Sequence, residues 1–184
     1  MDVDEVVSSL DDGEVFLVLV DYDNFREVSN MLTAELLDKG LEGIFFTTDR
    51  TFEDVREELD FEGADATSLR FIDVVSKKRG ITDADGKVDL VDSPTAFNDI
   101  NLAFSKFFDD MGPGSFVVLD SFTSYLLYGS LKPIGNFVKK MTDKSRDRES
   151  KFFLLAMKTQ IDDETIDRLM TFCDRKFDLA GEKV

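Results

Sequence analysis

Two acidic side chains follow the first apolar run of the chain, and their spacing could support metal or phosphoryl chemistry. Residues 15–20 are uninterrupted apolar residues, and Asp21-Tyr22-Asp23-Asn24 comes directly after them. A short apolar run rich in valine predicts a strand that is buried on both faces of a parallel sheet. Ligands of open α/β sheets bind at the carboxyl ends of the strands. The turn at residues 21–24 is therefore the first candidate site.

A second apolar run ends in the same kind of side chain. Residues 116–119 are Phe-Val-Val-Leu, and Asp120 and Ser121 follow them. An aspartate at the tip of a buried strand is the means by which P-loop ATPases hold Mg²⁺. Asp120 is therefore a candidate magnesium ligand, with Asp21 as the second carboxylate of such a site.

The composition excludes several classes of chemistry and of partner. The chain has no histidine and one cysteine, Cys173, which excludes Ser-His-Asp and Cys-His catalysis, histidine-ligated metals and an internal disulfide. We expect Cys173 to lie in the core. The net charge of -17 argues against binding to nucleic acid, because that binding requires cations that neutralise phosphates. The first ten residues do not resemble a signal peptide, and no apolar run approaches the roughly 20 residues that span a bilayer. We expect a cytoplasmic protein without membrane insertion.

The elements that must position these side chains alternate along the whole chain. Apolar runs predict strands at residues 15–20, 43–48, 69–75, 116–119, 152–157 and 176–179, and helical periodicity predicts helices at residues 24–39, from Thr51, from Ser93, at 133–146 and at 161–172. We expect Asn24, Thr51 and Ser93 to cap their helices. Residues 80–92 are expected to form a loop or a hairpin. Alternating strands and helices predict an α/β fold of three layers, with a mostly parallel sheet between helices, in one domain over residues 1–184.

The order of these elements resembles the RecA superfamily and, within it, the KaiC-like branch, over about residues 13 to 180. In that branch the first helix ends in a glycine, as at Gly40, and the next helix opens with a Glu-Asp pair, as at Glu53-Asp54. Its third strand ends in Ile-Asp, as at Ile72-Asp73, and its Walker B strand reads like residues 117–121. The resemblance implies a RecA/P-loop NTPase-like core in an archaeal protein.

The chain departs from this family where the Walker A loop should lie. That loop has glycines whose N–H groups wrap the phosphates and a lysine that neutralises them. Residues 21–26 read Asp-Tyr-Asp-Asn-Phe-Arg instead, and only Arg26 could replace the lysine. Asp49 falls at the position of the family's water-activating glutamate, and Arg50 is its neighbour. The resemblance therefore implies a fold that has lost ATP hydrolysis, and ATP binding with it.

The predicted site is a degenerate nucleotide site near Asp21, Asp23, Asn24, Asp49, Asp120 and Ser121. We expect no catalytic residues and no cofactor there, and Mg²⁺ or ATP remains an open alternative at Asp120 and Asp21. Members of this branch assemble into rings and act as regulators or motor accessories. The resemblance thus implies a regulatory protein that binds a protein partner, such as an active KaiC-like paralogue or further copies of itself. The acidic surface and residues 80–92 are candidate contact regions.

Two enzymatic or signalling alternatives stay open on the sequence. Strand-Asp-x-Asp, as at Asp21 and Asp23, opens the phosphohydrolases of haloacid-dehalogenase type, where the first aspartate is the nucleophile and the second the general acid. Thr47 or Thr48 could then bind phosphate, Lys158 could neutralise charge and Asp120 could complete a Mg²⁺ site. The usual Gly-Thr continuation is replaced by Asn-Phe.

A receiver-like signalling domain would use Asp73 as phosphoacceptor and Lys158, but the connection after Asp73 is too long for it.

Two further features have weaker interpretations. The segment Asp83-Ala84-Asp85-Gly86 is similar to part of an EF-hand calcium loop. The flanking helices and the bidentate acidic residue that ends such a loop are not evident. The basic cluster Lys77-Lys78-Arg79 could contact phosphate or an acidic partner, although a solvated loop is the favoured interpretation.

Overall fold

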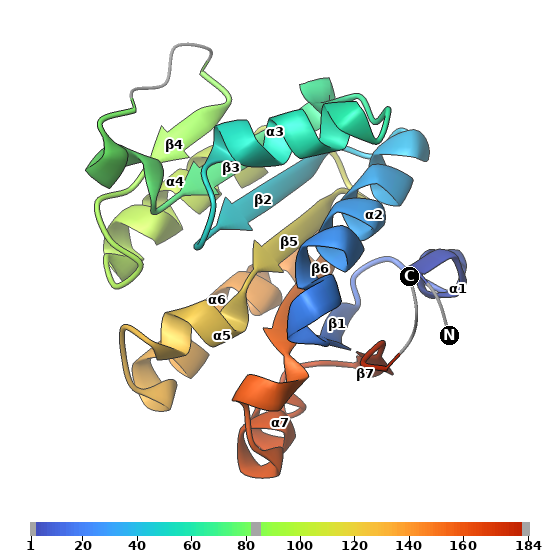
Figure 1. The fold of residues 1–184 in the computed structure, drawn as a ribbon, viewed down its shortest axis with the longest axis vertical. Coiled ribbons are helices and arrows are strands. Elements are labelled where there is room, and N and C mark those ends of the chain that lie inside the picture. Colours follow the sequence, from blue (N-terminus) through green and yellow to red (C-terminus); the bar gives the residue numbers. More distant parts are fainter. Residues whose placement is uncertain (1–2, 82–85, 182–184) are drawn as a thin grey trace.

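The computed structural model describes residues 3–81 and 86–181 and shows one parallel sheet with helices on both faces (Figure 1). Within the described residues the sheet has seven strands in the order β4-β3-β2-β5-β6-β1-β7. Every neighbouring pair is parallel. The strands are β1 (Val15–Val20), β2 (Gly43–Thr47), β3 (Leu69–Asp73), β4 (Val88–Leu90), β5 (Phe116–Asp120), β6 (Lys151–Met157) and β7 (Arg175–Asp178).

The helices divide between the two faces of the sheet and make a three-layer molecule. One face carries α1 (Val3–Ser8), α2 (Phe25–Asp38) and α3 (Phe52–Phe61). The other carries α4 (Phe97–Asp109), α5 (Phe122–Leu126), α6 (Leu131–Arg146) and α7 (Asp163–Leu169). Connections between parallel strands cross over through helices, so the loops that leave the carboxyl ends of the strands turn toward one face or the other.

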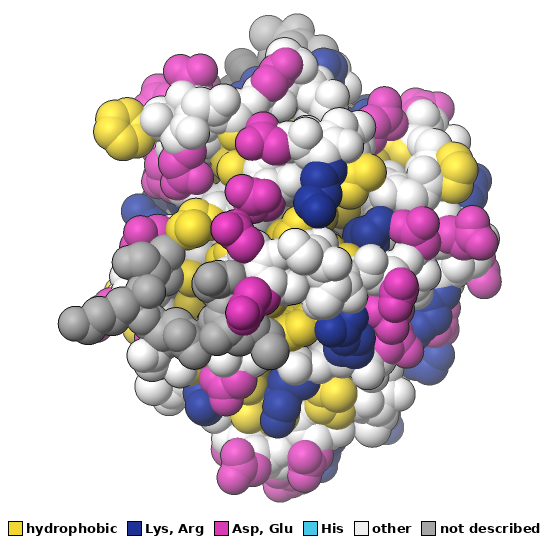
Figure 2. Space-filling model, turned by 90° about the vertical axis from the view of Figure 1, so that its right-hand side faces the viewer, with side chains coloured by type: hydrophobic (Ala, Val, Ile, Leu, Met, Phe, Trp, Pro, Cys, Tyr) yellow, Lys and Arg dark blue, Asp and Glu magenta, His cyan; other side chains and the backbone are white. Residues whose placement is uncertain are grey.

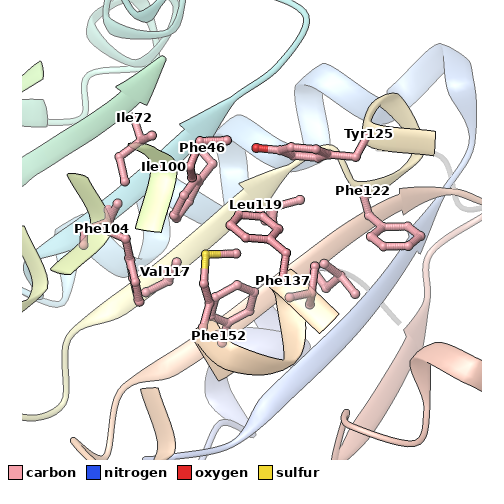
Figure 3. Close-up of a cluster of buried hydrophobic side chains, with 14 of the residues drawn as sticks. Phe46, Ile72, Ile100, Phe104, Val117, Leu119, Phe122, Tyr125, Phe137 and Phe152 are labelled. Atoms are coloured by element: carbon pink, nitrogen blue, oxygen red, sulfur yellow. The ribbon is translucent and has the colours of Figure 1, made fainter. Parts of the chain in front are cut away.

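The core between the sheet and α4 to α6 combines aliphatic side chains with several aromatic ones. Phe46, Leu119 and Phe152 point from the strands toward Phe104 of α4 and Phe137 of α6 (Figure 3). Each fully buried phenylalanine contributes about 1.5–3 kcal/mol through the area it removes from water. Cys173 is buried in this layer, as expected.

Several boundaries differ from the sequence-based prediction. Residues 88–90 form β4, a parallel edge strand on β3, so the predicted loop or hairpin is wrong for these residues. Residues 82–85, with Asp83 and Asp85 of the calcium hypothesis, lie outside the described residues. Helix α4 begins at Phe97 and not after Ser93, because the Ser93 hydroxyl accepts a hydrogen bond from the Thr95 N–H in a turn of its own. The short helix α5 was not predicted. Thr51 caps α3 as predicted, with a complete capping box, whereas the Asn24 side chain makes no capping hydrogen bond.

The outer surface shows both signs of charge. On the face in Figure 2, which carries the described ends of the chain, acidic side chains are interspersed with basic ones, and hydrophobic side chains occupy only small patches. Among the helices of the described residues, none is both long enough and apolar enough to cross a bilayer.

Candidate functional site

A cleft of about 470 Å³ opens at the carboxyl ends of the four central strands. The chain leaves β1 and β2 toward α2 and α3 on one face, and leaves β5 and β6 toward α5 and α7 on the other. Loops that diverge in this way leave a crevice between them. Its lining comes from all four strand ends and comprises Tyr22, Asp23, Phe25, Arg26, Asp49, Arg50, Asp120, Ser124, Leu127, Met157 and Gln160.

Asp120 lines this cleft, and one oxygen of its carboxylate is hydrogen-bonded to the protein's own groups. The residue ends β5 and its side chain is only 5% exposed. Its Oδ2 accepts hydrogen bonds from Arg50 Nη2 at 2.8 Å and from Ser29 Oγ at 3.0 Å. Arg50 follows β2, and Ser29 lies on the buried face of α2. Three elements therefore meet at one carboxylate oxygen.

Arg50 is the centre of a longer network that runs from buried Asp120 to the partly exposed Glu58. Its side chain is 4% exposed, and it pairs with Glu58 of α3 through Nη1 as well as with Asp120 through Nη2. Glu58 Oε2 also accepts a hydrogen bond from Asn30 Nδ2 at 2.9 Å. The guanidinium carbon lies 5.6 Å from the centre of the Phe45 ring, within cation–π range. The planar guanidinium thus bridges two carboxylates on different elements.

The electrostatics of Asp120 reflect this burial. Removal from water raises the pKa of Asp120 above its usual value, while the positive charge of Arg50 and the hydrogen bonds from Arg50 and Ser29 oppose that rise. A buried charge is tolerated only when a partner and hydrogen bonds replace water, and loss of the partner is strongly destabilising. Arg50 is the counter-charge that this chain supplies to Asp120.

The backbone around Asp120 is held as firmly as its side chain. Thr48 Oγ1 donates to the Asp120 carbonyl at 2.9 Å and accepts from the Ser121 N–H at 2.9 Å. The Asp120–Ser121 peptide bond is cis. The Ser121 hydroxyl caps α5 through the Ser124 N–H, and the Ser124 hydroxyl in turn donates to Asp49. Asp49, Asp120 and Ser121 therefore lie close together; Asp49 and Asp120 line the cleft, whereas Ser121 is buried outside its lining.

The acidic turn after β1 is divided between the cleft and its outside. Tyr22–Asn24 forms one turn of 3₁₀ helix, which directs Asp23 into the cleft lining. The Asp21 carboxylate instead accepts a hydrogen bond from the Gly181 N–H, and neither Asp21 nor Asn24 lines the cleft. In the described part of the chain, no cluster of three or more acidic, histidine or cysteine side chains could hold a metal ion.

The residues of the two alternatives have local partners. The Lys158 ammonium pairs with Asp178 at 2.7 Å, which raises the pKa of the lysine, and Lys158 is not in the cleft lining. Thr47 donates its hydroxyl to the Arg50 carbonyl. Asp73 is fully buried, and its two oxygens accept from the N–H groups of Phe52, Val75 and Ser76 and from the Ser76 hydroxyl. Asp73 thus ties the end of β3 to the start of α3.

Sequence reasoning missed the partners of Asp120. Arg50 was noted beside Asp49 but not paired with Asp120, from which it is 70 residues distant in sequence. Ser29 carried a usable signal, because a serine on the buried side of an otherwise apolar helix face needs a hydrogen-bond partner. Glu58 carried no such signal.

Comparison with known proteins places the chain in a family and a fold. A family model described as a family of unknown function, DUF7504, matches residues 17–179. No curated protein matches the chain. Protein PH0250 from Pyrococcus horikoshii OT3 is similar in structure with a TM-score of 0.62 and 13% identity, over 98% of this chain and 89% of that one.

Two further solved structures are similar over most of their length. PH0321 from Pyrococcus horikoshii, solved in complex with an unknown peptide, matches with a TM-score of 0.66 and 11% identity over 96% of this chain and 81% of that one. The flagellar accessory protein FlaH from Methanocaldococcus jannaschii matches with a TM-score of 0.63 and 9% identity, over 92% of this chain and 72% of that one. These likenesses confirm the RecA-like three-layer α/β fold. The match over residues 17–179 shows that the chain belongs to the family of unknown function DUF7504.

Proposed function

We propose that this protein is a regulatory, protein-binding member of the KaiC-like proteins that neither hydrolyses ATP nor requires a metal. The observation that carries the proposal is the buried ion pair between Arg50 and Asp120. A P-loop ATPase uses the corresponding strand-tip aspartate for Mg²⁺. In this chain one oxygen of that aspartate, Oδ2, accepts hydrogen bonds from a guanidinium and from a serine hydroxyl.

The charge of the cleft supports the same proposal. Asp23 and Asp49 line it together with Asp120, and the turn after β1 offers no glycine-rich backbone to wrap a phosphate. Arg26 is the remaining cation of the lining; its Nη1 lies 4.0 Å from Glu58 Oε1. A nucleotide triphosphate would meet carboxylates where it needs N–H donors, so its binding is unfavourable.

Two structural neighbours support a role in protein binding. PH0321 was solved with an unknown peptide, and FlaH is described as an accessory protein. We infer by analogy that this chain acts through contact with another protein, an active KaiC-like paralogue being the first candidate. Self-association into a homo-oligomer is the second form of the same proposal.

Calorimetric titration tests the loss of nucleotide binding. We expect no binding heat when Mg²⁺, or ATP with Mg²⁺, is titrated into the purified protein. Binding that disappears in an Asp120→Asn variant would show a working nucleotide site and would overturn the proposal. A Mg²⁺-dependent hydrolysis of p-nitrophenyl phosphate that Asp21→Asn abolishes, while Asp73→Asn does not, would establish the phosphohydrolase alternative instead.

A further inference from the structure

A second hollow, of about 280 Å³, lies between α2 and α3, outside the cleft lining. The two helices lie side by side on the same face of the sheet (Figure 1). The residues that line this α2–α3 hollow are Asn30, Asp54, Glu57, Glu58, Phe61 and Glu62. Four of the six are acidic, and none is a cation.

The negative charge of the hollow is only partly compensated. Glu58 pairs with the buried Arg50, and the exposed Arg26 and Arg79 lie 4.0 Å from Glu58 and Asp54. Within the described residues, Glu57 and Glu62 form no ion pair at all. Burial, together with the nearby charge of Glu58, raises the pKa of Glu62 above its usual value. A positive charge placed here would gain attraction that the chain itself does not supply.

Asn30 provides an independent sign of a missing partner. The residue is 4% exposed, and its Nδ2 donates to Glu58. Its Oδ1 is buried and accepts no hydrogen bond. Buried polar atoms in folded proteins nearly always have a partner, because an unsatisfied one loses its hydration without compensation. Asn30 lines the hollow, so a movement of its side chain would bring this oxygen to an N–H donor that enters there.

Phe61 adds an aromatic surface at the same place. It is 94% exposed at the end of α3, which is the least favourable setting for so large an apolar side chain. An aromatic ring beside carboxylates is the arrangement that holds a guanidinium, which stacks on the ring face while its N–H groups reach the oxygens. A divalent metal fits less well, since the acids of the described residues do not converge into a metal-binding group.

We propose that the α2–α3 hollow binds an arginine side chain from a basic segment of the partner protein. The guanidinium stacks on Phe61, pairs with Glu57 and Glu62, and donates to Asn30 Oδ1. This inference rests on the proposed protein-binding function and names the chemistry of its partner. It also links the two sites, because the Glu58 oxygen that accepts from Asn30 accepts from Arg50 as well.

Peptide binding tests the proposal at the level of the side chain. A fluorescent peptide with one arginine flanked by glycines and serines is titrated at about 0.15 M salt, where the Debye length is about 8 Å and long-range attraction to the acidic protein is screened. The matched peptide carries citrulline, which keeps the shape and loses the charge. We expect saturable binding of the arginine peptide alone, with a shift of the Asn30 side-chain amide in ¹H–¹⁵N spectra.

Three surface variants separate the hollow from general electrostatics. Phe61→Ala and Glu62→Gln are expected to weaken the arginine peptide by about threefold to tenfold each. Glu53→Gln removes the same charge from the exposed first turn of α3, outside the hollow, and is expected to leave the affinity unchanged. Equal weakening by Glu53→Gln, equal binding of the citrulline peptide, or an unmoved Asn30 amide would overturn the proposal.

The outcome is distinguishable from the test of the proposed function. If the protein binds Mg·ATP and also binds the arginine peptide in the α2–α3 hollow, the proposed loss of nucleotide binding fails and the site stands. If the protein binds neither Mg·ATP nor the arginine peptide, the arginine site fails and the proposed loss of nucleotide binding stands.

Discussion

At the scale of single residues, the most consequential contact is the one between Arg50 and Asp120. Both side chains are buried, and Glu58 shares the same guanidinium. Burial of charge is expensive, so each member of such a group depends on the others. Stability measurements can therefore show whether the three act as one unit.

We expect Arg50→Met to destabilise the protein by about 3–5 kcal/mol, because it leaves two carboxylates without their buried cation. Methionine keeps much of the length and apolar volume of the arginine stem. The double variant Arg50→Met/Asp120→Asn should be more stable than Arg50→Met alone, since the stranded charge is gone. Urea denaturation of the wild type, of Arg50→Met, of Asp120→Asn and of the double variant measures these differences. A double variant that equals the sum of the single changes would mean that the pair is not coupled.

The buried thiol of Cys173 should make the free energy of unfolding fall at alkaline pH. Burial raises the pKa of Cys173 from 9.0 to about 12. The folded state keeps the proton over this interval while the unfolded state loses it, so the thiol's contribution is complete below pH 9 and is lost as pH rises toward 12. The loss is at most about 1.4 kcal/mol per pH unit.

The Cys173→Ala variant isolates this contribution from that of other groups that titrate at high pH. Urea midpoints between pH 8 and about pH 11 should fall less steeply in the variant than in the wild type. Parallel slopes would show that the thiol is not protected from ionisation. Native Cys173 should also react slowly with iodoacetamide at pH 8, because the thiolate is the nucleophile.

The sequence predicted which strand tips carry acids but not what those acids contact. That Asp49 and Asp120 lie at the same edge of the sheet follows from the pattern, because parallel strands end on one side. That β2 and β5 are neighbours, which brings the two acids together, is seen only in the structure. Asp21 directly follows the first strand, yet its carboxylate accepts a hydrogen bond from the Gly181 N–H. No pattern in the sequence around Asp21 predicts this contact. The pairing of Arg50 with Asp120 depends on the three-dimensional path of the loop after β2 and is invisible in the linear chain.

At the scale of elements, the close packing of β2 against β5 depends on a residue without a side chain. Gly43 opens β2, and its partner in the register is Phe116 at the start of β5. A Cβ added at Gly43 would overlap the Phe116 ring. The glycine therefore lets a fully buried aromatic ring cross the neighbouring strand.

We expect Gly43→Ala to destabilise the protein by about 1–3 kcal/mol, because the Phe116 ring must leave its packed position. Gly135→Ala is the matched control. Gly135 lies within α6, and an added Cβ there meets no atom within 4 Å. Alanine in a helix interior should stabilise by about 0.5–1 kcal/mol. Thermal unfolding of both variants should move the midpoint in opposite directions, and a destabilising Gly135→Ala together with a neutral Gly43→Ala would contradict the packing argument.

The elements that were predicted correctly are those with a long and regular pattern. The central strands are continuous apolar runs, and α3 begins at a complete capping box. The errors fall where the pattern is short. Three residues of β4 were assigned to a hairpin because pairing to β3 is a long-range choice, and α5 spans only Phe122–Leu126, too short for a helical period to show. The serine–proline start assigned to α4 was overridden by a local serine turn.

At the scale of the whole molecule, the excess of acids sets the response to salt. The chain has 39 acidic and 22 basic side chains, and many exposed cations already pair with acids. The net charge of -17 makes the compact state repel itself. This repulsion acts over longer distances than the ion pairs do, so screening should relieve it first.

We expect the midpoint of thermal unfolding to rise by several degrees between about 0.05 M and 0.5 M sodium chloride, because the Debye length shortens from more than 10 Å to less than 8 Å. Differential scanning calorimetry at constant pH measures the change. An equal rise with an uncharged osmolyte of the same osmolality would assign it to solvent exclusion instead. A midpoint that falls with salt would mean that surface ion pairs outweigh the repulsion.

The Arg50 guanidinium that pairs with Asp120 has a consequence for how the protein would work in a cell. Metal ions and nucleotides come and go with metabolism, and a strand edge that depends on them changes with the supply. A guanidinium that is part of the chain cannot be chelated, hydrolysed or exchanged. Under the proposed function, the edge formed by β1, β2, β5 and β6 would keep one arrangement when energy is scarce and when it is plentiful. In a complex with partners that change conformation as nucleotide binds and leaves, this chain would be the subunit whose binding surface stays the same.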